Sequence, residues 1–220
     1  MRNDKPRRPG GRWDPREILY DLVLERPLTA IRRKVVELVT GAGLFPLVDI
    51  CCGPGNQLRR LARRADGAAA LPAVGLDISL RGVRYAAARA PGVSFVCGDG
   101  TALPFRAGAF RAALLSFALH EQEPEVRRRL LAAAGEAVGP GGRLILVDFE
   151  NPWNSKSRLA HASYITVTER VAGRDHLRLN RDFHRRGGLR ALLAGCGLEE
   201  LVRQDVGAGC CAIVVAARRP

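Results

Sequence analysis

Residues 47–57 read LVDICCGPGNQ, and this stretch decides the fold. Mostly apolar residues come first, a glycine-rich turn follows, and Leu58 and Leu61 open a helical pattern. That order predicts a buried parallel strand, a tight turn and a crossover helix. Gly53 and Gly55 let the turn fold sharply and let a ligand approach bare backbone. An open α/β sheet binds a nucleotide at this point, just beyond the carboxyl end of its first strand.

Two residues of this stretch argue against a dinucleotide. A dinucleotide fingerprint has a third small residue where the helix packs on the strand, and Leu58 occupies that position here. Asp49 lies inside the strand, and a carboxylate is a poor neighbour for a pyrophosphate. An acidic strand end suits a ligand that carries positive charge.

The rest of the chain alternates between strand and helix patterns, which predicts a doubly wound parallel sheet. Strands are expected at residues 47–52, 73–78, 93–97, 110–119 and 143–149, and helices at 82–90 and 124–138. A helix at 189–194 then precedes strands at 198–206 and 211–217. The glycine-containing link between these two strands is too short for a crossover, so they form an antiparallel hairpin. The predicted fold class is therefore α/β, a mostly parallel Rossmann-like sheet of seven strands with the last strand antiparallel.

Length and composition indicate one domain. A chain of 220 residues that is 47% hydrophobic suits a single domain with a buried core. Residues 1–12 are basic, rich in proline and glycine, and followed by no apolar segment, so we predict a disordered leader before a domain at 13–220. Residues 13–40 carry two helical stripes separated at Pro27, interpreted as an N-terminal helical lid in which Tyr20 faces a substrate or simply packs. No apolar run approaches the roughly 18 residues of a membrane helix, so the predicted location is cytoplasmic.

The net charge of +13 raises the question of nucleic-acid binding. The cations are nearly all arginines and are spread along the whole chain, which favours weak, sequence-independent association over a specific site. Acidic substrates and peripheral contact with an anionic membrane remain compatible with the charge. The six cysteines include no C-x-x-C pair, so we expect reduced core thiols and no metal site.

Four features, including the Asp49 turn already described, occur in the order and spacing of a known family. They are the Asp49 turn itself, GLDIS at 75–79, GDG at 98–100 followed by LPF at 103–105, and GPGG at 139–142 before a strand. Together with the terminal hairpin they resemble the class I S-adenosyl-L-methionine-dependent methyltransferases, over about residues 47–218. The run FALHE at 117–121 resembles the small-molecule branch that contains the ubiquinone and menaquinone C-methyltransferases.

The resemblance implies S-adenosyl-L-methionine as cofactor and S-adenosyl-L-homocysteine as product. Asp77 follows the glycine turn by about 20 residues, where a carboxylate can accept both ribose hydroxyls. Asp99 can accept from the exocyclic amine of adenine, and Asp49 with the turn holds the methionine end. Ser116 and Phe117 flank the sulfonium where the fourth strand ends. The predicted cofactor-binding residues are Asp49, Gly53, Gly55, Asp77, Ile78, Gly98, Asp99, Gly100, Ser116 and Phe117.

The substrate is expected to be a small or lipid-like molecule. Residues 116–119 lack the proline-containing run of amino-directed DNA methyltransferases, and the double-glutamate loop of protein arginine methyltransferases is not recognisable, although Glu121 and Glu123 are near. No carboxylate trio for magnesium stands out either. The resemblance makes residues 151–188, with a helix at 157–172, an insertion that covers the substrate. The predicted substrate-binding residues are Tyr20, His161, Tyr164, Glu169, His176 and Asn180.

His120 is the predicted catalytic residue. The methyl donor is already activated, so the enzyme mainly has to align the acceptor behind the methyl group, which supplies about 7–11 kcal/mol of barrier reduction. His120 directly follows the fourth strand and can take a proton from the acceptor; it can equally orient the substrate or cap a helix. The alternative functions are an RNA methyltransferase, a nicotinamide-dependent oxidoreductase and a non-catalytic scaffold that keeps the nucleotide-binding fold. The sequence does not determine the acceptor atom or the oligomeric state.

Overall fold

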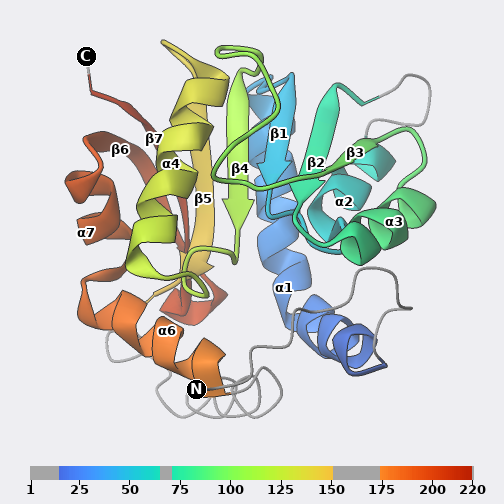
Figure 1. Ribbon diagram of the computed structural model, residues 1–220, viewed down its shortest axis with the longest axis horizontal. Coiled ribbons are helices and arrows are strands. Elements are labelled where there is room, and N and C mark those ends of the chain that lie inside the picture. The colour runs from blue at the N-terminus through green and yellow to red at the C-terminus, as the bar shows by residue number, and fades with distance from the viewer. Residues whose placement is uncertain (1–14, 65–70, 151–173, 220) are drawn as a thin grey trace, which may run out of the picture.

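A seven-stranded sheet forms the centre of the protein (Figure 1). The computed structural model describes residues 15–64, 71–150 and 174–219. The strand order is β3-β2-β1-β4-β5-β7-β6, and β7 runs antiparallel to both neighbours. This confirms the predicted fold class and the terminal hairpin. The strands are β1 Leu47–Ile50, β2 Ala73–Asp77, β3 Ser94–Cys97, β4 Ala112–Ser116, β5 Arg143–Phe149, β6 Leu198–Val206 and β7 Cys211–Arg218.

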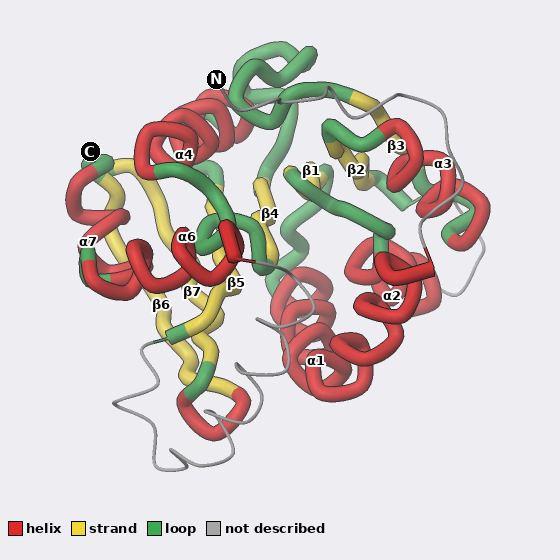
Figure 2. Tube along the Cα trace, turned by 60° about the horizontal axis from the view of Figure 1, so that its bottom comes forward, coloured by secondary structure: helices red, strands yellow, loops and turns green. Residues whose placement is uncertain are grey.

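Helices cover both faces of the sheet (Figure 2). One face is covered by α1 Pro15–Gly41, α2 Asn56–Arg64 and α3 Leu80–Arg89, and the other by α4 Pro124–Val138, α6 Arg174–Arg185 and α7 Gly188–Gly195. Successive strand residues point to opposite faces. Leu47 therefore packs in the core under α1 and α2, whereas Val48 packs in the core under α4 and α7. No helix within the described ranges has the length and apolar character to cross a membrane.

Helix α1 differs from its prediction. It is continuous from Pro15 to Gly41, so the separation into two helices at Pro27 is wrong. A proline inside a helix removes one hydrogen bond and bends the axis without ending the helix, and Figure 1 shows α1 changing direction along its length. The helix ends as expected: Gly43 adopts a φ of 58°, and the Leu44 amide donates to the Val39 carbonyl at 3.0 Å.

The second half of α1 is part of the core. Five of its apolar side chains are buried against the sheet: Leu28, Ile31, Val35, Val36 and Val39. These contacts fix the second half of α1 to the sheet. The lid role of residues 13–40 stays a prediction. The domain boundaries at residues 12 and 13 lie outside the described residues.

Leu58 packs against the sheet at a glycine of the neighbouring strand. A Cβ on Gly75 would lie 2.7 Å from a methyl carbon of Leu58 and 2.6 Å from the ring of Phe95. The small residue that allows α2 to pack closely on the sheet is therefore Gly75 of β2, and it is not a residue of the helix. This explains how the turn keeps its shape without a third glycine.

Two other segments depart from the sequence expectations. The fourth strand covers Ala112–Ser116 alone, and residues 117–120 form a loop whose first residue, Phe117, has a φ of 57°. Residues 174–185 form α6, which the sequence analysis did not predict as a helix. The helix predicted at 157–172 lies outside the described residues.

Candidate active site

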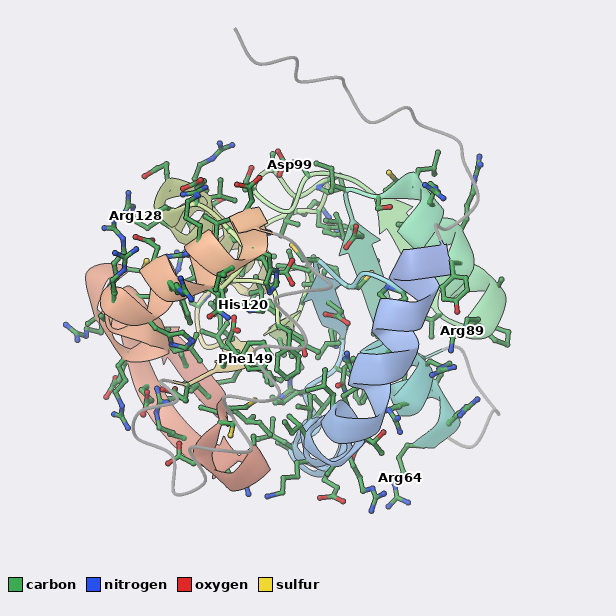
Figure 3. All side chains as sticks on the ribbon, turned by 90° about the horizontal axis from the view of Figure 1, so that it is seen from below. Arg64, Arg89, Asp99, His120, Arg128 and Phe149 are labelled. Atoms are coloured by element: carbon green, nitrogen blue, oxygen red, sulfur yellow. The ribbon has the colours of Figure 1, made fainter. Side chains whose placement is uncertain are left out.

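Three polar side chains share one face of the sheet at its carboxyl-end edge. Asp49 pairs in register with Gly75 on β2 and with Leu114 on β4. Asp77 and Ser116 lie two residues further along those strands and so point to the same face as Asp49. Figure 3 looks onto this edge, with Asp99 at its rim and His120 and Phe149 near its centre.

Asp49 is buried, and one of its carboxylate oxygens lacks a hydrogen bond among the described residues. Its carboxylate is 2% exposed, and its Oδ1 makes no hydrogen bond within the described part of the chain. Burial raises the pKa of Asp49 to about 7; the Arg32 charge opposes this and the Asp77 charge adds to it. An unpaired carboxylate of this kind fits a cationic ligand, because a positive group would restore its ionised form.

Asp77 organises the glycine turn. The Gly53 amide donates to Oδ2 of Asp77 and the Ser79 amide to Oδ1, both at 2.8 Å. The Ser79 hydroxyl in turn accepts from the Gly82 amide and caps α3. Gly53 has a φ of 52° with open space where a Cβ would stand, whereas a Cβ on Gly55 would meet Ala86 at 2.8 Å. The turn thus presents bare backbone at Gly53 beside a fixed carboxylate.

The predicted adenine side is more exposed. Asp99 accepts two 2.8 Å bonds from Thr101, from its amide and its hydroxyl, and these lower the pKa of Asp99. Ile78 is 77% exposed, so its apolar side chain is available for contact with a ligand. Gly100 is buried, and a Cβ there would meet Leu130 at 2.8 Å, so its small size is already required by helix packing.

The strands β1 and β4 both end in strained backbone. Cys51 and Phe117 adopt φ values of 59° and 57°, a region that costs energy for residues with a side chain. The Phe117 ring lies 5.2 Å from that of Phe149, and the Arg32 guanidinium lies 5.9 Å from the Phe117 ring centroid. Ser116 places a buried hydroxyl oxygen beside them with no hydrogen-bond partner among the described residues. Such strain recurs at ligand sites.

The charges of four carboxylates act on the thiol of the strained Cys51. Burial, and after it the charges of Asp77, Asp49, Glu121 and Asp99, together raise the pKa of the Cys51 thiol to about 12. The pKa of one thiol is therefore raised by acidic groups from four different segments. Their convergence makes this edge of the sheet negative. All six cysteines are free thiols, but their predicted place in the core is wrong for most of them: only Cys211 is buried, and Cys97 is exposed.

His120 is fixed by a buried carboxylate. Its Nδ1 lies 2.6 Å from Oδ1 of Asp148 on β5, and the Leu119 and His120 amides donate to Oδ2 of the same residue. The imidazole is 1% exposed, and its Nε2 has no hydrogen-bond partner within the described ranges. Burial alone lowers the pKa of His120, but the charge and hydrogen bond of Asp148, with the Glu121 charge, outweigh it and leave that pKa raised.

Glu121 and His176 complete a cluster that the sequence did not predict. Oε1 of Glu121 lies 3.6 Å from Nε2 of His120 and 3.8 Å from Nδ1 of His176. The two imidazole rings meet edge to face, with centroids 5.1 Å apart. Burial, and then the His120 charge, lower the pKa of His176 to about 4, while burial raises that of Glu121. We call His120, Glu121 and His176 the histidine cluster.

Arg127 holds α6 over this cluster. Its buried guanidinium donates from Nε to the Leu119 carbonyl, from Nη2 to the Leu179 carbonyl and from Nη1 to Asp182. One side chain of α4 thus ties the loop before His120 to the helix that carries His176. Asn180, one turn after His176, is 5% exposed, and its Oδ1 has no hydrogen-bond partner in the described residues. Both predicted residues of α6 therefore lie on its inner side.

The other predicted substrate residues cannot be placed. His161, Tyr164 and Glu169 lie outside the described residues, as does most of the predicted cover at 151–188. Tyr20 belongs to α1, but its side chain lies outside the described part. Their roles stay predictions.

The sequence itself has known relatives. Residues 47–142 match the family described as "Methyltransferase domain". The chain is 32% identical to a demethylmenaquinone methyltransferase of Renibacterium salmoninarum over 135 residues, 61% of this chain and 54% of that protein. It is 30% identical to a 2-phytyl-1,4-naphtoquinone methyltransferase of Thermosynechococcus vestitus over 125 residues, 54% of this chain and 52% of that protein. Over residues 47–142 the chain is similar to methyltransferases in sequence. It spans about half the length of the curated relatives it matches.

Solved methyltransferase structures share the fold. A mitomycin 7-O-methyltransferase superposes with a TM-score of 0.63 at 19% identity, over 94% of this chain and 59% of that one. A magnesium protoporphyrin IX methyltransferase from Synechocystis with bound S-adenosylhomocysteine gives 0.59 at 18% identity, over 96% and 90%. The predicted resemblance to methyltransferases is confirmed over residues 47–142, and the predicted fold is confirmed over the described residues. The RNA methyltransferase and oxidoreductase alternatives find no support in these comparisons.

Proposed function

We propose that this methyltransferase transfers the methyl group of S-adenosylmethionine to a small, oxygen-bearing aromatic acceptor. The observation that carries the proposal is the buried Oδ1 of Asp49, which has no hydrogen-bond partner among the described residues, at the strand edge that also carries Asp77. A cofactor with an ammonium and a sulfonium group matches this negative edge, because each positive charge favours the ionised carboxylates.

The residues present fit the cofactor. Asp77 is held by two backbone amides and keeps further lone pairs for the ribose hydroxyls. Asp99 and Ile78 provide a carboxylate and an apolar surface for the adenine. Asp49, with the bare backbone of Gly53, would hold the methionine end. The bound cofactor supplies an activated methyl group, and the protein has to place an acceptor in line with it.

The acceptor would lie between Phe117, Phe149 and the histidine cluster. Phe149 contacts both Phe117 and His120, with ring centroids at 5.2 and 4.8 Å, so one aromatic ring joins the two parts of the site. Nδ1 of His120 is hydrogen-bonded to Asp148, so Nε2 is the ring nitrogen that would face the acceptor. It would act there as a base or hold a group that binds the acceptor. His176 and Asn180 would bind the acceptor's polar groups.

The aromatic walls favour a quinone-like acceptor. The two relatives named above act on naphthoquinone-type molecules by name, and a reduced quinone offers both a flat ring and hydroxyl groups. Such an acceptor is lipid-like, so peripheral contact with a membrane and a cytoplasmic location remain predictions that accompany the proposal.

Binding and turnover test the proposal together. Calorimetry should show S-adenosylhomocysteine binding and no NAD binding, and labelled S-adenosylmethionine should methylate a reduced naphthoquinone. Asp175→Ala, an exposed change on α6, serves as the matched control for changes at the acidic edge. Binding of NAD alone, or methylation of an RNA pool with base specificity, would contradict the proposal.

A further inference from the structure

We propose that the histidine cluster binds one divalent transition-metal ion, and that an oxygen of the acceptor takes an open position on that ion. The ligands are Nε2 of His120, a carboxylate oxygen of Glu121 and Nδ1 of His176. The acceptor part rests on the proposed function, whereas the metal site stands on its own geometry.

The three ligand atoms are spaced for an ion. They all lie within 4.8 Å of one another, with Glu121 3.6 Å from His120 and 3.8 Å from His176. These separations are too long for hydrogen bonds. Two atoms that each lie about 2.0–2.2 Å from one ion are separated by up to about 4 Å, so the two carboxylate–imidazole distances already match. Small side-chain movements bring the imidazole nitrogens together.

The orientation of His120 is the second observation. Metal-binding histidines almost always donate their other ring nitrogen to a carboxylate or carbonyl, which fixes the ring and leaves a lone pair towards the metal. Here Asp148 lies 2.6 Å from Nδ1 and is itself held by three backbone amides, those of Leu119, His120 and Phe149. Nε2 is buried without a hydrogen-bond partner in the described part of the chain and faces Glu121. A buried, oriented and unpaired lone pair indicates a ligand.

The third ligand is held in place independently. His176 belongs to α6, and the three bonds of Arg127 fix that helix to the loop that carries His120. The charge of Arg127 acts on His120, but its guanidinium already donates to Asp182 and to two carbonyls. The negative charges of Asp148 and Asp77 lie within electrostatic range of Glu121. The ligand residues are therefore held in place before an ion binds, and the surrounding charge favours a cation.

The ligand set selects the class of ion. Two imidazoles and one carboxylate suit Zn²⁺, Co²⁺ or Fe²⁺, whereas Mg²⁺ and Ca²⁺ prefer oxygen ligands. Three protein ligands leave positions open, as in catalytic sites. A hydroxyl group of the acceptor bound there loses its proton to water at neutral pH more readily, and its electron pair stays on the oxygen. The acceptor would thus dock as an oxyanion beside Phe149.

Cobalt spectroscopy tests the site directly. Untagged full-length protein, stripped with a chelator, is titrated with Co²⁺, and the visible absorption of the bound ion is followed; Zn²⁺ then competes it off. We expect one equivalent of Co²⁺. His176→Gln and Glu121→Gln should each weaken binding by more than the about 10–100-fold that loss of an outer hydrogen-bond partner costs.

Two matched variants serve as controls. His184→Gln changes the other described histidine of α6, and Glu123→Gln changes a neighbouring exposed glutamate that pairs with Arg178. Both should keep wild-type Co²⁺ affinity. Absence of saturable Co²⁺ binding, or unchanged binding in His176→Gln and Glu121→Gln, would overturn the metal site. S-adenosylhomocysteine affinity is measured on the same samples: if it is normal while Co²⁺ fails to bind, the metal inference alone is wrong, and if it is absent, the proposed function is wrong.

Discussion

The two halves of the candidate site are built differently. On the cofactor side, Asp77 is held by backbone amides from its own turn and from the glycine turn of the adjacent strand. On the acceptor side, His120, Asp148 and His176 come from distant segments and meet through buried side-chain contacts. The cofactor side therefore depends on local backbone geometry, and the acceptor side depends on buried charge pairs. Substitutions should separate the two: those on the acceptor side cost stability, and those on the cofactor side cost ligand affinity.

Asp148→Ala should have the largest effect. It leaves three backbone amides and the His120 imidazole without their common acceptor in a buried place. Removing one partner of a buried charged pair typically costs about 3–5 kcal/mol. Urea denaturation followed by circular dichroism would measure the loss. Asp205→Ala, at an exposed position of β6, should change stability by less than about 0.5 kcal/mol; an equal loss in both variants would contradict the structural role of Asp148.

Asp49→Asn should make stability less sensitive to pH. Burial raises the folded-state pKa of Asp49 from 3.8 to about 7, so its contribution to stability is full below about pH 4 and is lost as pH rises through about 7. Relative to wild type, the Asn variant should therefore gain stability over that range, by up to about 4 kcal/mol at about 1.4 kcal/mol per pKa unit. Arg32 and Asp77 are the charged groups that act on Asp49 in the free protein.

The cofactor should reverse that difference. S-adenosylmethionine brings positive charge to Asp49 and so favours its ionised form, which removes the advantage of the Asn variant. Unfolding curves from pH 4.5 to 8, with and without cofactor, measure both effects. A difference between the two proteins that does not vary with pH would mean that Arg32 already keeps Asp49 ionised.

Asp77→Ala should weaken cofactor binding. Hydrogen bonds to charged groups contribute about 1.5–3 kcal/mol, which corresponds to roughly a 10–150-fold higher dissociation constant for S-adenosylhomocysteine by calorimetry. Asp175→Ala provides the control at an exposed carboxylate. An unchanged dissociation constant in Asp77→Ala would remove this residue from the cofactor site.

His176→Gln should have the smallest effect on the cofactor. The side chain belongs to the histidine cluster, and no contact joins it to Asp49, Asp77 or the glycine turn among the described residues. Its S-adenosylhomocysteine dissociation constant should stay within about twofold of wild type, since surface or distant changes are usually worth less than about 0.5 kcal/mol. A tenfold loss would show that the two halves are coupled.

The sequence by itself determined the sheet, the glycine turn and the row of polar side chains at one edge. Alternation along each strand fixes the face to which Asp49, Asp77 and Ser116 point, and parallel strands bring their carboxyl ends to the same edge. Those properties are local, so residue spacing is sufficient to predict them. The continuous α1 shows the limit of the local rules, because a proline within a helix is read as an end although packing of Ile31, Val35 and Val39 on the sheet keeps the helix in place.

Only the tertiary structure decided the acceptor side. His120 and His176 were predicted separately, and nothing in their spacing indicates that Glu121 lies between them or that Asp148 fixes the His120 ring. Their meeting depends on Arg127, whose buried guanidinium ties α6 to the loop after β4. Periodicity reports which face of an element is buried, whereas the distance between two segments depends on how side chains far apart in the chain pack and pair. That is why the carboxylate row could be predicted from residue spacing and the histidine cluster could not.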